Sequence, residues 1–430
     1  MNNVRIWTAV LLLAAGCDPG QRDATADPRG TSHYDIQVQI DPEQQFIRAS
    51  GRLHYRIPED SLDEVSFKLH RALTVDNFTV NGEASYRLDT NRMEVPWLPD
   101  AIRIVHPAGK RYAKGEIIRV EFAYHGHITQ WPEWSANVIG PEWTEMGLYF
   151  PWYPSIDQPF TYRVRVDMDP AYQVFVPGTP SRQGDGWFFE SESPVHDLVV
   201  CAAKDLHIRE TELSGQMFRI VNGPLSGATV DSIRADLESD YRTYTGWFGA
   251  IPPRDLTLVI SKREKGGGYA RSDALYLGGL TDSAYQHGRV DLRCYLAHEM
   301  AHFWWHGAPG DWEDWLNESF AEFSALLLVR EAFGQEAYRA LLDTKRQESR
   351  DTPPLWEIPR NDPSAYAVLY SKGPLLLSEL EEALGLEKFM ELCRARIDGE
   401  VNDTRGVLAL VEAADGPATA AWFEEALRSK

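Results

Sequence analysis

The residues best suited to chemistry in this sequence are two histidines and a glutamate in one short segment, His-Glu-Met-Ala-His at 298–302. Residues four apart lie on one face of a helix, so His298 and His302 can bind a single zinc ion through one imidazole nitrogen each. Glu299 follows the first histidine and is placed to take a proton from an attacking water. The segment therefore predicts a zinc site on a helix, with a general base beside it.

A zinc site of this kind needs a third protein ligand and leaves a fourth position for water. Glu318 ends the segment Trp-Leu-Asn-Glu at 315–318 and precedes an apolar run, 320–329, that predicts a buried helix. A carboxylate at the start of such a helix is unusual unless a cation faces it, and zinc would be that cation. Tyr370, in the segment Tyr-Ser-Lys-Gly at 370–373, could donate a hydrogen bond to a developing oxyanion.

These motifs, in this order, resemble those of the gluzincin zinc metallopeptidases of the aminopeptidase N type. The resemblance covers most of the chain and implies a hydrolase with one Zn²⁺ per chain and a peptide as substrate. It implies that His298, His302 and Glu318 bind the zinc, that Glu299 is the general base, and that Tyr370 stabilises the transition state.

The sequence departs from this family at two places. The fifteen residues between His302 and Glu318 are fewer than the family usually has, which should shorten a loop and leave the ligands intact. The family's aminopeptidases also carry a Gly-x-Met-Glu-Asn strand before the zinc helix, whose glutamate holds the substrate's free amino group. Here the matching stretch, 266–273, reads Gly-Gly-Gly-Tyr-Ala-Arg-Ser-Asp, without that glutamate. This departure argues against strict N-terminal exopeptidase action.

Gly267 and Gly268, in that stretch, are predicted to bind substrate, because a backbone without side chains lets the substrate backbone come close. The short strand expected next, 274–277, would border the cleft and could pair with an extended peptide. The alternative for the glycines is a plain flexible hairpin tip.

An aromatic-rich stretch, 128–160, is predicted to fill the β domain and the seam behind it, with a pocket wall as the alternative. The family resemblance implies an acidic or amide residue from this region near the site. Glu142 and Glu145 are the two candidates, and the spacing does not choose between them. Glu322, one turn after Glu318, could orient a metal-binding histidine or could be a solvated charge on the helix.

Length and composition fit a globular protein with two or three domains. The chain has 430 residues, of which 43% are apolar and 25% charged. The net charge of −21 is spread along the chain and argues against nucleic acid as a partner. The cysteines after residue 17 are too few for a disulfide framework. Of these, Cys294 on the zinc helix is expected to be a small buried residue rather than a ligand.

The N-terminus is predicted to be an export signal. Arg5 supplies a positive charge, and residues 7–15 form an apolar core that is too short to span a bilayer. Small residues before Cys17 resemble the bacterial lipoprotein processing box, which implies a lipid anchor at Cys17 and a place in the cell envelope. The alternative is an ordinary cleaved signal peptide and a secreted or periplasmic protein.

Period-two alternation begins at residue 33 and predicts an antiparallel β-sandwich. The pattern changes at about residue 214, where a helix is followed by a buried strand at 256–260 and a short strand at 274–277, and helices dominate from about residue 290. With the resemblance, this predicts a multidomain α+β protein with an N-terminal antiparallel β-sandwich, a thermolysin-like α/β zinc peptidase domain and short C-terminal helices. The expected parts are a signal peptide with a lipoprotein-type cleavage site (1–17), a flexible tether (18–32), the β-sandwich (33–210), the catalytic domain (211–350) and a C-terminal helical part that carries Tyr370 (351–430). Helices are expected at 231–248, 290–305, 316–333, 335–348, 373–384, 386–397 and 418–428.

The predicted function is a zinc-dependent metallopeptidase, an aminopeptidase-like enzyme of the cell envelope. The absence of the amine-binding glutamate leaves a second possibility, an endopeptidase or a hydrolase of N-blocked substrates. A third, of another class, is a non-catalytic surface-anchored binding protein on a peptidase fold.

Overall fold

The computed structural model describes residues 30–430 with short gaps. The gaps are 60–61, 92–100, 132–135, 148–149, 185, 214–215, 224, 253–255, 264–266 and 272–273. The predicted signal peptide, Cys17 and most of the predicted tether therefore lie outside the described residues. Within the described residues, no helix is both long and apolar enough to cross a membrane.

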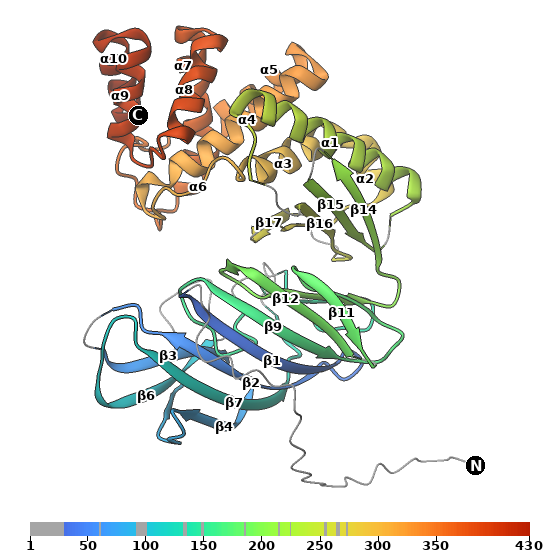
Figure 1. Cartoon of the computed structure of the whole chain (residues 1–430). Coiled ribbons are helices and arrows are strands. Elements are labelled where there is room, and N and C mark those ends of the chain that lie inside the picture. Colours follow the sequence, from blue (N-terminus) through green and yellow to red (C-terminus); the bar gives the residue numbers. More distant parts are fainter. Residues whose placement is uncertain are drawn as a thin grey trace.

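The N-terminal half of the described chain consists of β-strands (Figure 1). They are β1 (Ser32–Asp41), β2 (Phe46–Arg56), β3 (Leu62–His70), β4 (Thr74–Val80), β5 (Arg87–Asp89), β6 (Ala101–Tyr112), β7 (Ile117–His127), β8 (Thr144–Met146), β9 (Phe160–Asp167), β10 (Gln173–Phe175), β11 (Thr179–Gln183), β12 (Gly186–Val195) and β13 (Val200–Ala203). In β7, every second residue is buried. This period of two gives a strand one face for a core and one face toward solvent.

Two of the sheets enclose one apolar core. The larger sheet has the order β11-β12-β9-β1-β2-β7-β4, and within it β1 and β9 are parallel. The smaller sheet, β3-β6-β5, contributes Phe67 and Ile104 to the core that also holds Ile36 and Val164 of the larger sheet. A third, short sheet has the order β10-β13-β8. The β domain is thus a mostly antiparallel sandwich, in agreement with the alternation in the sequence.

The next part of the chain is a five-stranded sheet with helices on one side (Figure 1). Its elements are β14 (His207–Leu213), β15 (Gln216–Asn222), α1 (Gly227–Phe248), β16 (Leu256–Ile260), β17 (Gly267–Arg271), β18 (Ala274–Gly278), α2 (Asp282–His287) and α3 (Arg289–Ala301). Ile220 and Leu258 on one face share a core with α1 and α3. Val259 and Tyr276 on the other face pack with Trp143 of the β domain. The sheet therefore forms the seam between the two halves of the molecule.

The strand order corrects one sequence prediction. The sheet runs β14-β15-β16-β18-β17, so β18, the strand expected to border the cleft, is paired on both sides. The reason is that β17 and β18 form an antiparallel hairpin, with Gly268 opposite Leu277. Strand β17, which contains Gly267 and Gly268, thus lies at the edge of the sheet, where an extended peptide could pair with it. These two glycines are part of a strand and do not form a hairpin tip.

Helices make up the rest of the chain. They are η1 (Trp312–Asp314), α4 (Trp315–Phe333), α5 (Gln335–Glu348), α6 (Ala365–Ala367), the π-helical turn η2 (Val368–Lys372), α7 (Gly373–Leu384), α8 (Leu386–Asp398), α9 (Thr404–Asp415) and α10 (Pro417–Arg428). The run at 320–329 is buried along α4, as predicted. The predicted domain limits at 210 and 350 stay predictions.

The aromatic-rich stretch fills the core and the seam, as the sequence predicted. Trp152 and Tyr153 are buried in the core of the β domain, and Trp143 lies in the seam. Trp134 and Tyr149 lie outside the described residues. This stretch therefore joins the β domain to the sheet that carries the cleft edge.

Candidate zinc site and cleft

Two adjacent helices bring the predicted zinc ligands together. His298 lies in the last turn of α3, His302 follows the helix end, and Glu318 lies in the first turn of α4. The Nε2 atoms of the two histidines are 3.2 Å apart. The Oε2 atom of Glu318 lies 3.5 Å from Nε2 of His298 and 3.4 Å from Nε2 of His302. Three donor atoms therefore converge on one point, which we call the metal point.

The geometry of these donors fits a zinc ion. Donors bound at about 2.0–2.2 Å in a tetrahedral arrangement are about 3.3–3.6 Å from one another, and the three observed distances of 3.2–3.5 Å are close to this range. Oε2 of Glu318 is buried and makes no hydrogen bond, a costly state for a carboxylate oxygen that no cation faces. Among the described residues, no other group of His, Cys, Asp and Glu forms such a cluster. Two imidazoles and one carboxylate also match the ligand set of catalytic zinc sites.

The charges around the metal point favour a bound cation. Burial lowers the pKa of His298, but contacts with Glu318 and Glu322 outweigh this effect and raise the pKa to about 10. Burial raises the pKa of Glu318, but the two histidines hold it well below its usual value. The pKa of Glu322 is likewise raised by burial, and His298 and Lys345 lower it to about 2. Two ionised carboxylates thus lie beside the imidazoles, and a cation bound at the metal point would take the place of the proton that they favour on His298.

Each histidine has an acceptor beside its second nitrogen. Nδ1 of His298 lies 2.7 Å from Oε2 of Glu322, and Nδ1 of His302 lies 3.1 Å from the carbonyl oxygen of Trp305. Such contacts fix the orientation of a metal-binding ring and leave Nε2 for the metal. Because the side chain of Glu322 is only 12% exposed, the structure supports its histidine-orienting role over that of a solvated charge.

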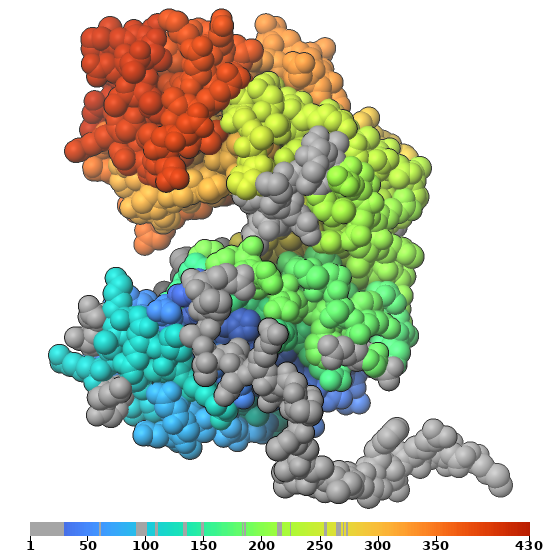
Figure 2. Space-filling model, in the orientation of Figure 1, coloured from blue at the N-terminus to red at the C-terminus, as the bar shows by residue number. Residues whose placement is uncertain are grey.

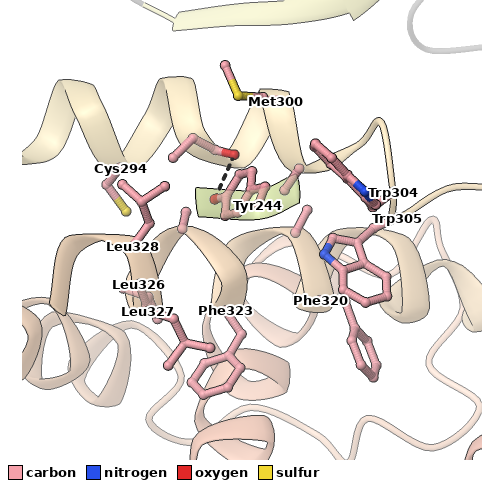
Figure 3. Close-up of a cluster of buried hydrophobic side chains, with 14 of the residues drawn as sticks. Tyr244, Cys294, Met300, Trp304, Trp305, Phe320, Phe323, Leu326, Leu327 and Leu328 are labelled. Carbon is pink, nitrogen blue, oxygen red and sulfur yellow. Dashed lines mark hydrogen bonds between the residues drawn. The ribbon is translucent and has the colours of Figure 1, made fainter. Parts of the chain in front are cut away.

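Helix α1 packs against α3, the helix that carries the two histidines. Asp240 pairs with Arg293 one turn before the zinc motif, and the hydroxyl of Tyr244 donates a hydrogen bond of 3.1 Å to the carbonyl of Ala297 (Figure 3). The apolar side chains around this contact in Figure 3 include Cys294, Met300, Trp304, Trp305, Phe320 and Leu328. Cys294 is only 7% exposed, in agreement with the prediction of a small buried residue.

A cleft of about 700 Å³ opens at the metal point. Its described lining residues all lie between Gly268 and Tyr370 and include the three ligands and Glu299. They come from β17, α3, α4, α5 and the segment around η2. In Figure 1, β17 lies on the side of the helical part that faces the β domain, and Figure 2 shows that the surface is hollowed between these two parts.

Gly268 lines the cleft. Its neighbours in the structure leave no space for a side chain, which the sequence did not reveal. A Cβ atom there would lie 2.2 Å from the carbonyl oxygen of Tyr276 and 2.2 Å from the hydroxyl of Tyr295. Glycine therefore allows the zinc helix to approach β17 closely. The substrate-binding roles of Gly267 and Gly268 stay predictions, and Gly266 lies outside the described residues.

A tyrosine, Tyr269, follows the glycines and lines the cleft, and its hydroxyl contacts the β domain. Its hydroxyl donates a hydrogen bond of 2.8 Å to Glu145, and the other oxygen of Glu145 accepts one of 2.8 Å from Nε1 of Trp143. Glu145 is fully buried. The side chain of Glu142 is 89% exposed, and its Oε2 atom lies 3.9 Å from Nζ of Lys262. Neither glutamate is among the described residues that line the cleft. The two acidic anchors that the sequence suggested are therefore not presented to a substrate.

Tyr370 lies on η2, beside His298. A π-helical turn is rare and is often found at functional sites. The ring of Tyr370 stacks on that of His298, with centroids 5.7 Å apart. Burial and the carboxylate of Glu318 raise the pKa of Tyr370, so its hydroxyl keeps the proton that a hydrogen-bond donor needs.

The rest of the Tyr-Ser-Lys-Gly motif holds this turn in place. Nζ of Lys372 donates to the carbonyl oxygens of Pro353 and Ser429, at 3.1 and 2.7 Å. A Cβ atom at Gly373 would lie 1.9 Å from Oγ of Ser319, the residue after the third ligand. Glycine at this position therefore lets the Tyr370 segment pack directly against the start of α4.

Tyr370→Phe is expected to lower kcat by about 10²–10³-fold, because one donor to the developing oxyanion is lost. Zinc content and KM should change much less, since Tyr370 is not one of the three converging donors. Steady-state kinetics on a peptide substrate and metal analysis measure both effects. An unchanged kcat would show that the Tyr-Ser-Lys-Gly motif has been given the wrong role.

Comparison with known proteins agrees with this site. Residues 280–404 match the model described as Peptidase family M1 domain. No curated protein matches the chain. Among solved structures, a mutant M1 zinc metallopeptidase from Deinococcus radiodurans, bound to a Tyr-Ser-Ala substrate, is 18% identical, with a TM-score of 0.67 over 92% of this chain and 93% of that chain.

Two further structures are similar. A two-domain M1 zinc metallopeptidase mutant bound to L-tryptophan is 17% identical, with a TM-score of 0.66 over 93% of this chain and 94% of that chain. Native yeast LTA4 hydrolase is 13% identical, with a TM-score of 0.62 over 91% of this chain and 66% of that chain. The segment with the metal point thus matches the M1 peptidase family domain, and the chain as a whole has the fold of the two-domain M1 zinc metallopeptidases.

Proposed function

We propose that this protein is a zinc-dependent metallopeptidase that hydrolyses peptide bonds. The observation that carries the proposal is the convergence of three donor atoms in one cleft with Glu299 and Tyr370. The similar Deinococcus protein was solved with a tripeptide described as its substrate, which supports peptides as the substrate class here.

The residues of the cleft can divide the chemistry between them. Zinc bound by His298, His302 and Glu318 would supply a Lewis acid that brings the pKa of water close to neutrality. Glu299 takes the proton from the attacking water and delivers it to the leaving nitrogen. Tyr370 donates a hydrogen bond to the oxygen on which negative charge develops.

Within this function, we propose an aminopeptidase-like enzyme that does not demand a free N-terminus. The observation behind this is that Tyr269 stands after Gly268, and that both oxygens of the nearby Glu145 already accept hydrogen bonds. Arg271 also lines this part of the cleft, 3.6 Å from Asp197. An ammonium group buried there without a carboxylate would be unfavourable. Action on N-blocked peptides or on internal bonds is the candidate that this arrangement favours.

Matched peptides with free and acetylated N-termini should therefore be cleaved with kcat/KM values within about tenfold of each other, a difference of about 1.4 kcal/mol. The measurement is a set of such pairs at one pH, with Tyr370→Phe as a control that should slow both members equally. A preference of about a thousandfold for the free amine, about 4 kcal/mol, would reveal an amine anchor and a strict aminopeptidase.

We also propose that the protein works in the cell envelope, held by a lipid at Cys17. The motif before Cys17 supports this proposal. Mass spectrometry of the mature N-terminus distinguishes a lipid-modified cysteine from an ordinary cleaved end, which would point to a secreted or periplasmic protein.

A further inference from the structure

Lys345 lies between two carboxylates at the wall of the cleft. Its Nζ atom is 2.6 Å from Oε1 of Glu322 and 4.0 Å from Oε2 of Glu348. The side chain is 16% exposed, and it is one of the residues that line the cleft around the metal point. The ammonium is therefore partly withdrawn from solvent and faces the carboxylate that contacts a zinc ligand.

Glu322 connects this ammonium to the metal point. One of its oxygens meets Lys345, and the other lies 2.7 Å from Nδ1 of His298. The terminal torsion of a glutamate has a broad, shallow preference, so one contact does not fix the carboxylate plane. With both oxygens held, the plane is fixed, and so is the ring of His298 whose Nε2 faces the metal point.

Glu348 connects Lys345 to the segment that carries Tyr370. Its Oε2 atom accepts a hydrogen bond of 2.7 Å from Oγ of Ser371, the residue after Tyr370. One turn of α5 thus carries both Lys345 and Glu348. Lys345 pairs with Glu322, and Glu348 accepts the hydrogen bond from Ser371 in the π-helical turn. Helix α5 therefore contacts both the carboxylate beside His298 and the turn that carries Tyr370.

We infer that Lys345 is a positioning residue, whose ammonium holds Glu322 so that His298 keeps its Nε2 directed at the zinc. The inference rests on the proposed zinc function. It adds a residue to that function, because Lys345 is not one of the converging donors and acts only through Glu322. Loss of a residue that orients a metal ligand typically weakens metal binding by about 10–100-fold.

The test measures zinc affinity by competition with a chelator, using the purified full chain and three lysine variants. Lys345→Met should weaken zinc binding by at least about tenfold, and Lys345→Arg should stay within about threefold of the unchanged protein, because arginine can still pair with Glu322. Lys388→Met is the matched control, since Lys388 pairs with Asp415 at 2.7 Å and does not line the cleft. Thermal unfolding without metal shows whether each variant is folded.

A double-mutant cycle shows whether the effect passes through Glu322. Glu322→Ala alone should weaken zinc binding by about 10–100-fold. In that background, Lys345→Met should add less than about twofold, because the two residues act as one unit. The inference is overturned if Lys345→Met binds zinc as tightly as the unchanged protein. It is also overturned if the losses of zinc affinity in Lys345→Met and Glu322→Ala multiply in the double variant. Either result leaves the proposed function in place. An unchanged protein that binds no zinc overturns both.

Discussion

Glu299→Gln is expected to bind zinc as the unchanged protein does and to lose about 10²–10⁴-fold in kcat. Glu299 lines the cleft beside the three ligands but is not one of the converging donors. Glutamine keeps the size and shape of the side chain, but its amide cannot accept the proton of the attacking water. The loss should therefore appear in kcat with little change in zinc content.

Metal analysis and steady-state kinetics on the same preparation measure these two quantities. Asp291→Asn is a suitable control, because Asp291 is a carboxylate that lines the cleft, is not one of the converging donors, and is exposed near the start of α3. It should retain most of the activity. Full turnover by Glu299→Gln would contradict the general-base role. If the unchanged protein holds zinc and cleaves no peptide, the non-catalytic binding protein becomes the better reading.

Loss of any single zinc ligand should remove both metal and activity. Replacement of His298, His302 or Glu318 by Ala leaves two donors of the triangle, and two donors do not hold zinc against a chelator as three do. Zinc should fall from about one per chain to a small fraction of that after dialysis, and turnover should fall to the background of the assay. The unchanged protein should lose activity with its zinc and regain it when zinc returns.

The control for this experiment is a histidine outside the site. His287 is an exposed residue at the end of α2, where its Nδ1 contacts the carbonyl oxygen of Ser283. His287→Ala should keep its zinc and its turnover. Full zinc occupancy in all three ligand variants would show that the metal, if present, is bound elsewhere.

Most helices could be predicted from the sequence because their apolar periodicity is local. The expected helix 335–348 coincides with α5, and 373–384 coincides with α7. The helix expected at 290–305 ends at Ala301, since the residues after it turn toward α4 and provide the carbonyl of Trp305 for His302. The helix α9 was not predicted, although Asp403 caps it by accepting a hydrogen bond from the backbone N–H of Gly406.

Two of the candidate zinc ligands could be predicted from the sequence because the spacing of His298 and His302 is a property of one helix. The pairing with Glu318 was supported by the order of the motifs, but only the packing of α3 on α4 brings the donor atoms within 3.5 Å. The choice between the two interpretations of Glu322 needed its burial and its contact with His298.

The contacts of Tyr269 and Glu322 at the cleft could not be predicted from the sequence, because they depend entirely on tertiary structure. Glu145 bonds to Tyr269 across 124 positions of sequence, and Lys345 meets Glu322 from a different helix. Spacing along the chain carries no information about such contacts, because they form where separate elements pack. The spacing of the histidines along α3 predicted the chemistry, whereas the packing of β17, α5 and the β domain around that helix decided which side chains line the cleft.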